Sequence, residues 1–215
     1  MTNGSTRLAD AEIGTRQDKG MAQAELITLL LSRRSLPPRR LIEPAPDRAH
    51  LETILSAAAT APNHGGLRNF RVIEIAPDAR PQLCALFETA ERELNPDATT
   101  EDLERAREKA SHAPMLLLFV LRAYEEHPDI PTIEQHASAG AALGNMLLAI
   151  HALGFGAMAV SGHKLATEAF RKAFKLQSFE HALCFIAVGT YSGPPRQKER
   201  FDPDQFHSVW GEEEG

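Results

Sequence analysis

The chain has 215 residues, of which 43% are hydrophobic and 24% charged, and its formal net charge is -6 at pH 7. This length and composition predict one soluble globular domain with a core of ordinary size. The acidic balance argues against a nucleic-acid partner, since such binders usually present a basic face, and no apolar run reaches the roughly 18 residues of a membrane span.

The N-terminal residues are polar and mixed in charge, without the apolar centre of a secretory signal. We therefore interpret residues 1–20 as a flexible arm and residues 21–215 as a single domain in the cytoplasm.

The first predicted helix covers residues 21–32, and Pro37 and Pro38 prevent its continuation. Asp47 is a candidate N-cap for a second helix, which stops before Pro62.

The middle of the chain alternates between strand and helix signals. Residues 70–75 predict a strand, and Asp78 begins the next helical stretch. Thr99 or Thr100 then caps a charged helix over residues 101–110, whose rows of Glu and Arg suit a solvated face.

Residues 115–121 are almost all apolar and predict a strand that is buried on both faces. The longest helical pattern, 131–153, ends at Gly154. Its interior is rich in small residues, which indicate either a self-association face or a central core helix: Ala137, Ala139, Gly140, Ala141, Ala142, Gly144 and Ala149.

The last third of the chain predicts a short strand over 155–160, a short helix over 167–174 and a buried strand over 182–188. An extended tail rich in proline and charge follows from residue 192 to residue 210. The element order indicates a layered domain of helices and strands without regular βαβ alternation.

Thiol and metal chemistry receive little support from the sequence. Cys84 and Cys184 have no CxxC or zinc spacing, which predicts buried free thiols in a reducing compartment. The histidines show no ligand spacing with cysteine or carboxylate, so we expect no metal site.

Two segments carry the strongest functional signal. Ser32-Arg33-Arg34-Ser35 ends the first helix, and its guanidiniums and hydroxyl offer forked donors to an anion. The alternative is structural, because cations at a helix C-terminus also complement the helix dipole. The loop Ala61-Pro62-Asn63-His64-Gly65-Gly66 offers an imidazole and two glycines to a flat ligand, although His64 alone could be a solvent-facing loop residue. Together the segments suggest a phosphorylated planar cofactor.

A series of short motifs over residues 21–193 resembles the nitroreductase-like flavoproteins, and most closely their compact YdjA-like branch. The markers, in chain order, are Ser32-Arg33-Arg34-Ser35, Glu43-Pro44-Ala45-Pro46, Ala61-Pro62-Asn63-His64, Phe70-Arg71, Ala113-Pro114, Glu134, Gly154-Phe155-Gly156, Ser161-Gly162 and Gly189-Thr190.

The resemblance implies an α+β fold with three α/β/α layers, in which helices wrap a mixed, mainly antiparallel sheet. It also implies a homodimer that binds one FMN at each of two subunit interfaces. The residues that it assigns to the cofactor are Arg33, Arg34, Ser35, Thr60, His64, Ala159, Val160 and Ser161. The branch has an arginine at the position of Thr60, and a tryptophan and an arginine where Ala159 and Val160 stand.

The function implied by the resemblance is an FMN-dependent NAD(P)H oxidoreductase that reduces nitroaromatics, quinones or similar small acceptors by a ping-pong sequence. We expect no catalytic side chain, because the flavin supplies the chemistry and the protein positions it. Two alternatives remain open: a flavin-binding storage or sensing protein without turnover, and an interaction protein whose arginines bind an acidic group of a partner.

Overall fold

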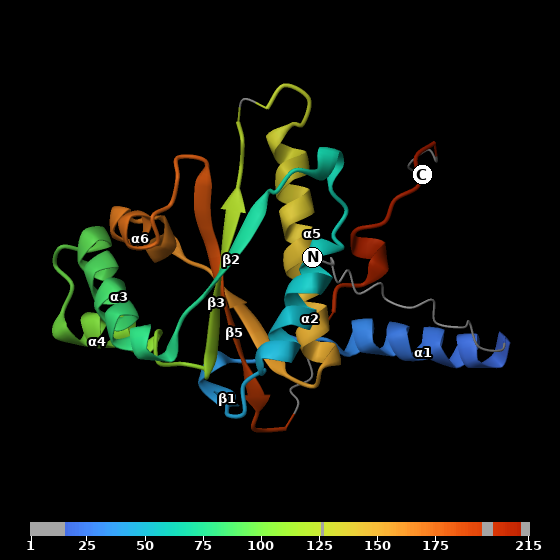
Figure 1. Ribbon diagram of the computed structural model, residues 1–215, viewed down its shortest axis with the longest axis horizontal. Coiled ribbons are helices and arrows are strands. Elements are labelled where there is room, and N and C mark those ends of the chain that lie inside the picture. The colour runs from blue at the N-terminus through green and yellow to red at the C-terminus, as the bar shows by residue number, and fades with distance from the viewer. Residues whose placement is uncertain (1–15, 126, 195–199, 212–215) are drawn as a thin grey trace, which may run out of the picture.

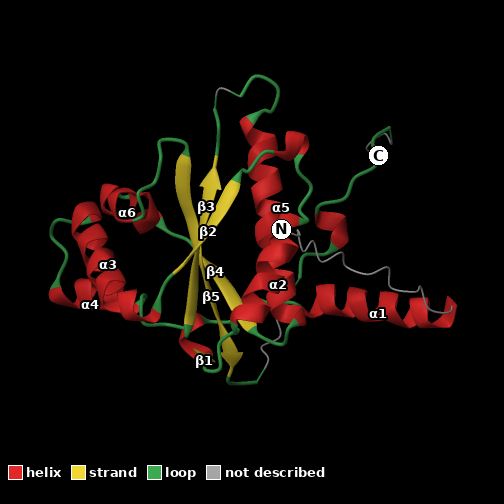
Figure 2. Ribbon diagram, viewed as in Figure 1, coloured by secondary structure: helices red, strands yellow, loops and turns green. Residues whose placement is uncertain are grey.

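The computed structural model describes residues 16–125, 127–194 and 200–211. Its centre is a five-stranded sheet with helices on both sides (Figures 1 and 2). The strands are β1 (Leu41–Ile42), β2 (Phe70–Glu74), β3 (Met115–Arg122), β4 (Gly156–Val160) and β5 (Glu180–Tyr191).

The strand order is β1-β5-β3-β2, with β4 also paired to β5. Each of these pairings is antiparallel, and no parallel pair occurs among the strands that the structure describes. The fold is therefore α+β with a mainly antiparallel sheet, as the resemblance predicts. It is neither regularly alternating nor doubly wound.

Strand β3 lies at the centre of the sheet, and all of its residues from Met115 to Leu121 are buried. Successive side chains point to opposite faces, so Leu117 and Phe119 enter one core cluster while Leu118 and Val120 enter the other. The continuous apolar run thus reflects two covered faces, as predicted.

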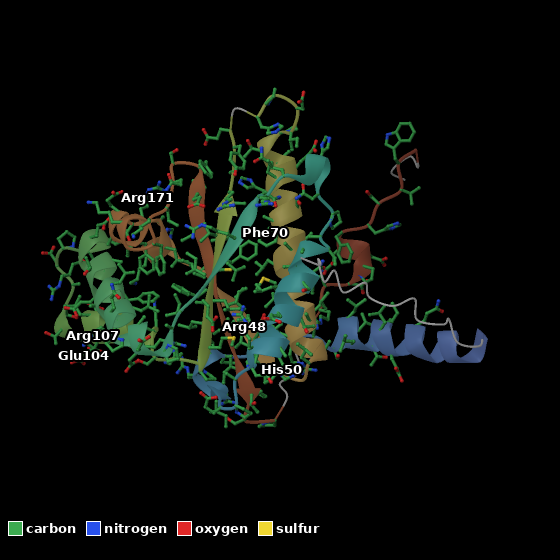
Figure 3. All side chains as sticks on the ribbon, in the orientation of Figure 1. Arg48, His50, Phe70, Glu104, Arg107 and Arg171 are labelled. Atoms are coloured by element: carbon green, nitrogen blue, oxygen red, sulfur yellow. The ribbon has the colours of Figure 1, made fainter. Side chains whose placement is uncertain are left out.

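Helices α2 (Arg48–Ala59) and α5 (Thr132–Ala152) cover the first face (Figure 1). Asp47 caps α2 by accepting a hydrogen bond from the backbone N–H of His50, as predicted. Phe70, labelled in Figure 3, stacks on Phe119 beneath these helices, with ring centroids 5.3 Å apart.

The small residues of helix α5 indicated either a core helix or a self-association face, and the structure tests the first of these. The buried residues of α5, which confirm the core role, are Gln135, Ala139, Ala142, Met146 and Ile150. No described atom lies within 4 Å of a Cβ placed on Gly140 or Gly144. That side of the helix is open, and its self-association stays a prediction.

Helices α3 (Arg80–Leu94), α4 (Thr100–Glu108) and α6 (Glu168–Ala173) cover the second face. Thr99, the first of the two candidate caps, forms a reciprocal capping box with Asp102. Arg107 and Glu104, labelled on α4 in Figure 3, are exposed, as expected for a charged helix.

Helix α1 (Arg16–Ser32) extends away from the three layers (Figure 1). It begins five residues before the predicted start at Met21, so residues 16–20 are helical; residues 1–15 of the expected arm lie outside the described residues. Strand β5 is also longer than predicted, and the two-residue strand β1 was not predicted. Among the residues that the structure describes, no helix is both long and apolar enough to span a membrane.

Candidate functional site

The C-terminus of α1 forms the positively charged wall of a recess of about 230 Å³. Arg33 and Arg34 line it together with Ser32, while α5 contributes Leu147 and His151. The remaining lining residues are Leu36, Phe155, Ala157 and Tyr191. The recess therefore combines guanidinium, hydroxyl and imidazole groups, which are all capable of binding an anion.

Arg200 is a third guanidinium at this helix end, and the sequence analysis missed it. Its Nη2 donates hydrogen bonds to the carbonyl oxygens of Leu31 and Arg33, at 3.2 and 2.5 Å. The last carbonyls of a helix lack intrahelical partners, so Arg200 satisfies two of them. Burial, and then the charge of Arg200, lower the pKa of Arg33. A bound anion would relieve this concentration of positive charge.

The chain then runs from the recess along the edge strand β4. The backbone N–H of Leu36 donates to the carbonyl oxygen of Ala157 at 3.0 Å. Gly156 leaves room for this approach, because a Cβ there would lie 2.8 Å from the terminal side-chain carbons of Leu36 and Leu41, which would have to move. Ser35 is exposed in this connecting segment.

Beyond the segment lies a larger cavity of about 650 Å³ between the second face of the sheet and α3. Its walls are mainly apolar, and among the described residues that line it none is acidic. The apolar and glycine lining comprises Pro37, Pro38, Phe87, Leu94, Leu116, Met158, Val160, Gly162, Leu165, Phe185 and Ala187. The polar lining comprises Arg39, Lys109, His112, Ser161, His163 and Lys164. A cavity of this size and character suits a small planar ligand with polar edges.

Lys109 and Lys164 make one wall of this cavity cationic. Lys164 forms an ion pair with Glu91 of α3, and both side chains are largely buried. Burial, and then the neighbouring Lys164, lower the pKa of Lys109. Lys109 is an exposed residue, so its ammonium remains partly hydrated, and sequence analysis could not single it out because lysines at the end of a charged helix are common.

The three residues predicted at the end of β4 and just after it do not all face the same way. Val160 and Ser161 line the cavity, whereas Ala159 packs against the core on the α2–α5 side. Arg33 and Arg34 line the separate recess beside Ala157, on the α2–α5 side, so the predicted residues divide between the two faces of β4.

Thr60 and His64 lie elsewhere in the same chain. Thr60 Oγ1 accepts a hydrogen bond from Asn145, and His64 Nδ1 lies 2.8 Å from a carboxylate oxygen of Glu134. Glu134 is in the first turn of α5 and His151 is in the last, so the His64 pair and the arginine recess are about 25 Å apart at 1.5 Å per residue. Thr60 and His64 are both exposed.

The cysteines are free, as predicted. Cys184 is buried, and burial raises the pKa of its thiol to about 11, which makes it unreactive; Cys84 is half-buried. Within the described ranges, no cluster of three or more His, Cys, Asp or Glu side chains is placed to hold a metal ion.

Comparison with known proteins matches residues 30–190 to the nitroreductase family. A Haemophilus influenzae protein named "Putative NAD(P)H nitroreductase" is 32% identical over 166 residues, which are 77% of this chain and 88% of that protein. The Escherichia coli protein named "Putative NAD(P)H nitroreductase YdjA" is 31% identical over the same shares of the two chains.

Two solved structures share the fold. A nitroreductase-like family protein from Bacillus cereus has a TM-score of 0.72 and 17% identity, covering 94% of this chain and all of its own. A nitroreductase from Desulfovibrio desulfuricans, described as putative and solved in complex with FMN, has a TM-score of 0.64 and 23% identity, covering 86% of this chain and 96% of its own.

Proposed function

The chain belongs to the nitroreductase family, and from that premise we propose that it is an FMN-dependent NAD(P)H oxidoreductase. Its acceptors would be nitroaromatics, quinones or similar small molecules, and it would act in the cytoplasm as one domain over residues 21–215. The observation that carries the proposal is the arginine-rich recess at the end of α1, together with a large, mainly apolar cavity on the other face of β4.

The residues present fit FMN. Arg33 and Arg34 would hold the phosphate, with the Ser35 hydroxyl and Arg200 beside them. The cavity offers about 650 Å³ to the ring system, with apolar walls formed in part by Met158, Val160 and Phe185. When bound, FMN supplies hydride exchange between nicotinamide and the acceptor.

Lys109 is the side chain that we expect to tune this chemistry. Its ammonium lies in a wall without an acidic lining residue among those described, where a positive charge favours electron uptake by a neighbouring ring. Ser161 adds a hydroxyl at the end of β4. We assign no obligatory acid or base, so donor and acceptor would occupy the same cavity in turn, which is a ping-pong sequence.

A homodimer is part of the proposal. The apolar side chains of α1 that are exposed, with exposures from 41% to 72%, are Leu26, Ile27, Leu30 and Leu31. Such a face on a helix that extends from the body is typical of a protein interface (Figure 1). The open side of α5 at Gly140 and Gly144 would admit a second backbone. In this assembly the exposed Thr60 and His64 would contact the cofactor of the partner subunit.

The decisive experiment is the visible spectrum of the purified protein, before and after addition of NADH or NADPH under anaerobic conditions. We expect a flavin spectrum that one or both nucleotides bleach and that a quinone restores. A yellow protein that neither nucleotide bleaches would identify a storage or sensing protein. A colourless protein that does not take up added FMN would refute the flavoprotein assignment.

A further inference from the structure

His151 stands in the arginine recess but has no role in the function proposed so far. It lies in the last turn of α5, and its Nε2 is 2.9 Å from the Oγ of Ser32, at the end of α1. Both residues line the recess with Arg33 and Arg34. The imidazole thus belongs to the same surface as the guanidiniums that would bind the phosphate.

The hydrogen bonds of Ser32 define the state of this ring. The Ser32 hydroxyl has one hydrogen and donates it to the carbonyl oxygen of Leu29 at 3.0 Å. In this arrangement the hydroxyl oxygen accepts from His151, in the tautomer whose Nε2 carries the hydrogen. Protonation of His151 then occurs at Nδ1 and leaves the link between α1 and α5 intact.

The charges around His151 oppose its protonation. Burial, and then Arg33 and Arg34, lower the pKa of His151 below its ordinary value of 6.5. Strand β5 contributes Tyr191, whose hydroxyl donates to the carbonyl oxygen of Pro194, and Arg200 adds a further positive charge beside Arg33. No acidic residue is among the described residues that line the recess.

We propose that His151 is a proton-linked member of the anion site, which takes up one proton from solvent when a phosphate group binds beside Arg33 and Arg34. The phosphate offsets the positive potential that keeps the imidazole neutral, and the imidazolium in turn attracts the phosphate. The inference rests on the proposed function, because it takes the phosphate of FMN as the physiological anion.

The linkage has a defined sign. Between the pKa of His151 without the anion, below 6.5, and its higher pKa with the anion, binding takes up nearly one proton. The contribution of His151 to affinity is therefore largest at low pH and falls by up to about tenfold for each unit of rising pH within that window. The FMN phosphate works in the opposite sense, because its second ionisation, near about pH 6, increases its negative charge.

Sulfate separates these two effects, since its charge is constant over this pH range. The first measurement is an NMR titration of the His151 ring signals in the wild-type protein, with and without saturating sulfate. We expect sulfate to raise the pKa of His151 by about one unit or more. An unchanged pKa would overturn the proposal and leave His151 as a neutral link between α1 and α5.

The second measurement compares FMN affinity from about pH 5.5 to about pH 8 in wild type and His151→Gln, whose amide can still donate to Ser32. We expect wild type to bind several-fold more tightly at the acid end and the two affinities to converge at the alkaline end. His181→Gln is the matched control, because His181 is exposed near the opposite end of β5 from Tyr191.

A ratio of the two affinities that stays constant with pH would also overturn the proposal. Absence of FMN binding by the wild-type protein would instead refute the proposed function, and the sulfate titration would still decide the role of His151.

Discussion

The ion cluster around Glu180 leads to a quantitative prediction about stability. Glu180 begins β5, and only 2% of its side chain is exposed. Arg71 of β2 donates to both of its carboxylate oxygens, at 2.7 and 2.8 Å, and Arg122 at the end of β3 donates to one of them at 3.0 Å. The cluster therefore connects the ends of three strands.

The magnitude follows from the pKa of this carboxyl. The hydrogen bonds from Arg71, with smaller contributions from the backbone N–H of Gln177 and from Arg122, lower the pKa of Glu180 from 4.5 to about 2 despite its burial. A folded-state pKa below the unfolded value stabilises the protein above about pH 4.5, and this stability is lost as the pH falls towards 2. The shift corresponds to about 3 kcal/mol at neutral pH.

Glu180→Gln imitates the protonated carboxyl at every pH. We expect the variant to lose about 3 kcal/mol of unfolding free energy at pH 7, measured by urea denaturation, and the gap to wild type to shrink at about pH 3. Glu74→Gln is the control, because Glu74 is exposed in β2 and its loss should change stability by less than about 0.5 kcal/mol. A gap of the same size at both pH values would refute the reasoning.

Three further predictions concern the site and the sheet. Arg34→Ala should weaken FMN binding by roughly ten- to hundredfold but leave riboflavin binding unchanged, because riboflavin lacks the phosphate. Fluorescence titrations measure both affinities, and equal losses for the two ligands would contradict the assignment of Arg34 to the phosphate. Lys109→Met should lower the midpoint potential of bound flavin by about 30 mV in anaerobic dye equilibration, and an unchanged potential would place the ammonium away from the ring. Gly189→Ala should cost about 1–3 kcal/mol in urea unfolding, since its Cβ would lie 2.7 Å from a side-chain carbon of Pro114, and an unchanged stability would contradict this close packing.

The sequence predicted those elements whose signals lie in residues adjacent to one another in the chain. The apolar run of β3 and the cap of α2 at Asp47 depend on adjacent residues, so both could be read without tertiary information. The start of β5 could not, because Glu180 resembles a surface residue until Arg71 and Arg122 are brought beside it.

Only those residues of the candidate site that belong to a family motif could be predicted from the sequence. Arg33 and Arg34 were identified, but Arg200 and Lys109 have no local pattern and reach the site only through folding. The order of motifs also grouped His64 with the arginines, although α5 separates them within one chain. A motif set describes a family's site without stating which subunit supplies each residue.

The contact between Arg200 and the end of α1 has a consequence for biosynthesis. Arg200 and Arg33 are 167 residues apart in the chain, so the positive wall of the recess is complete only after residue 200 has been translated. A nascent chain that already contains the sheet would still lack this guanidinium. Tight cofactor capture would therefore require a chain that extends past residue 200, and a ribosome-released fragment that ends before this residue would remain a weaker competitor for the cell's flavin.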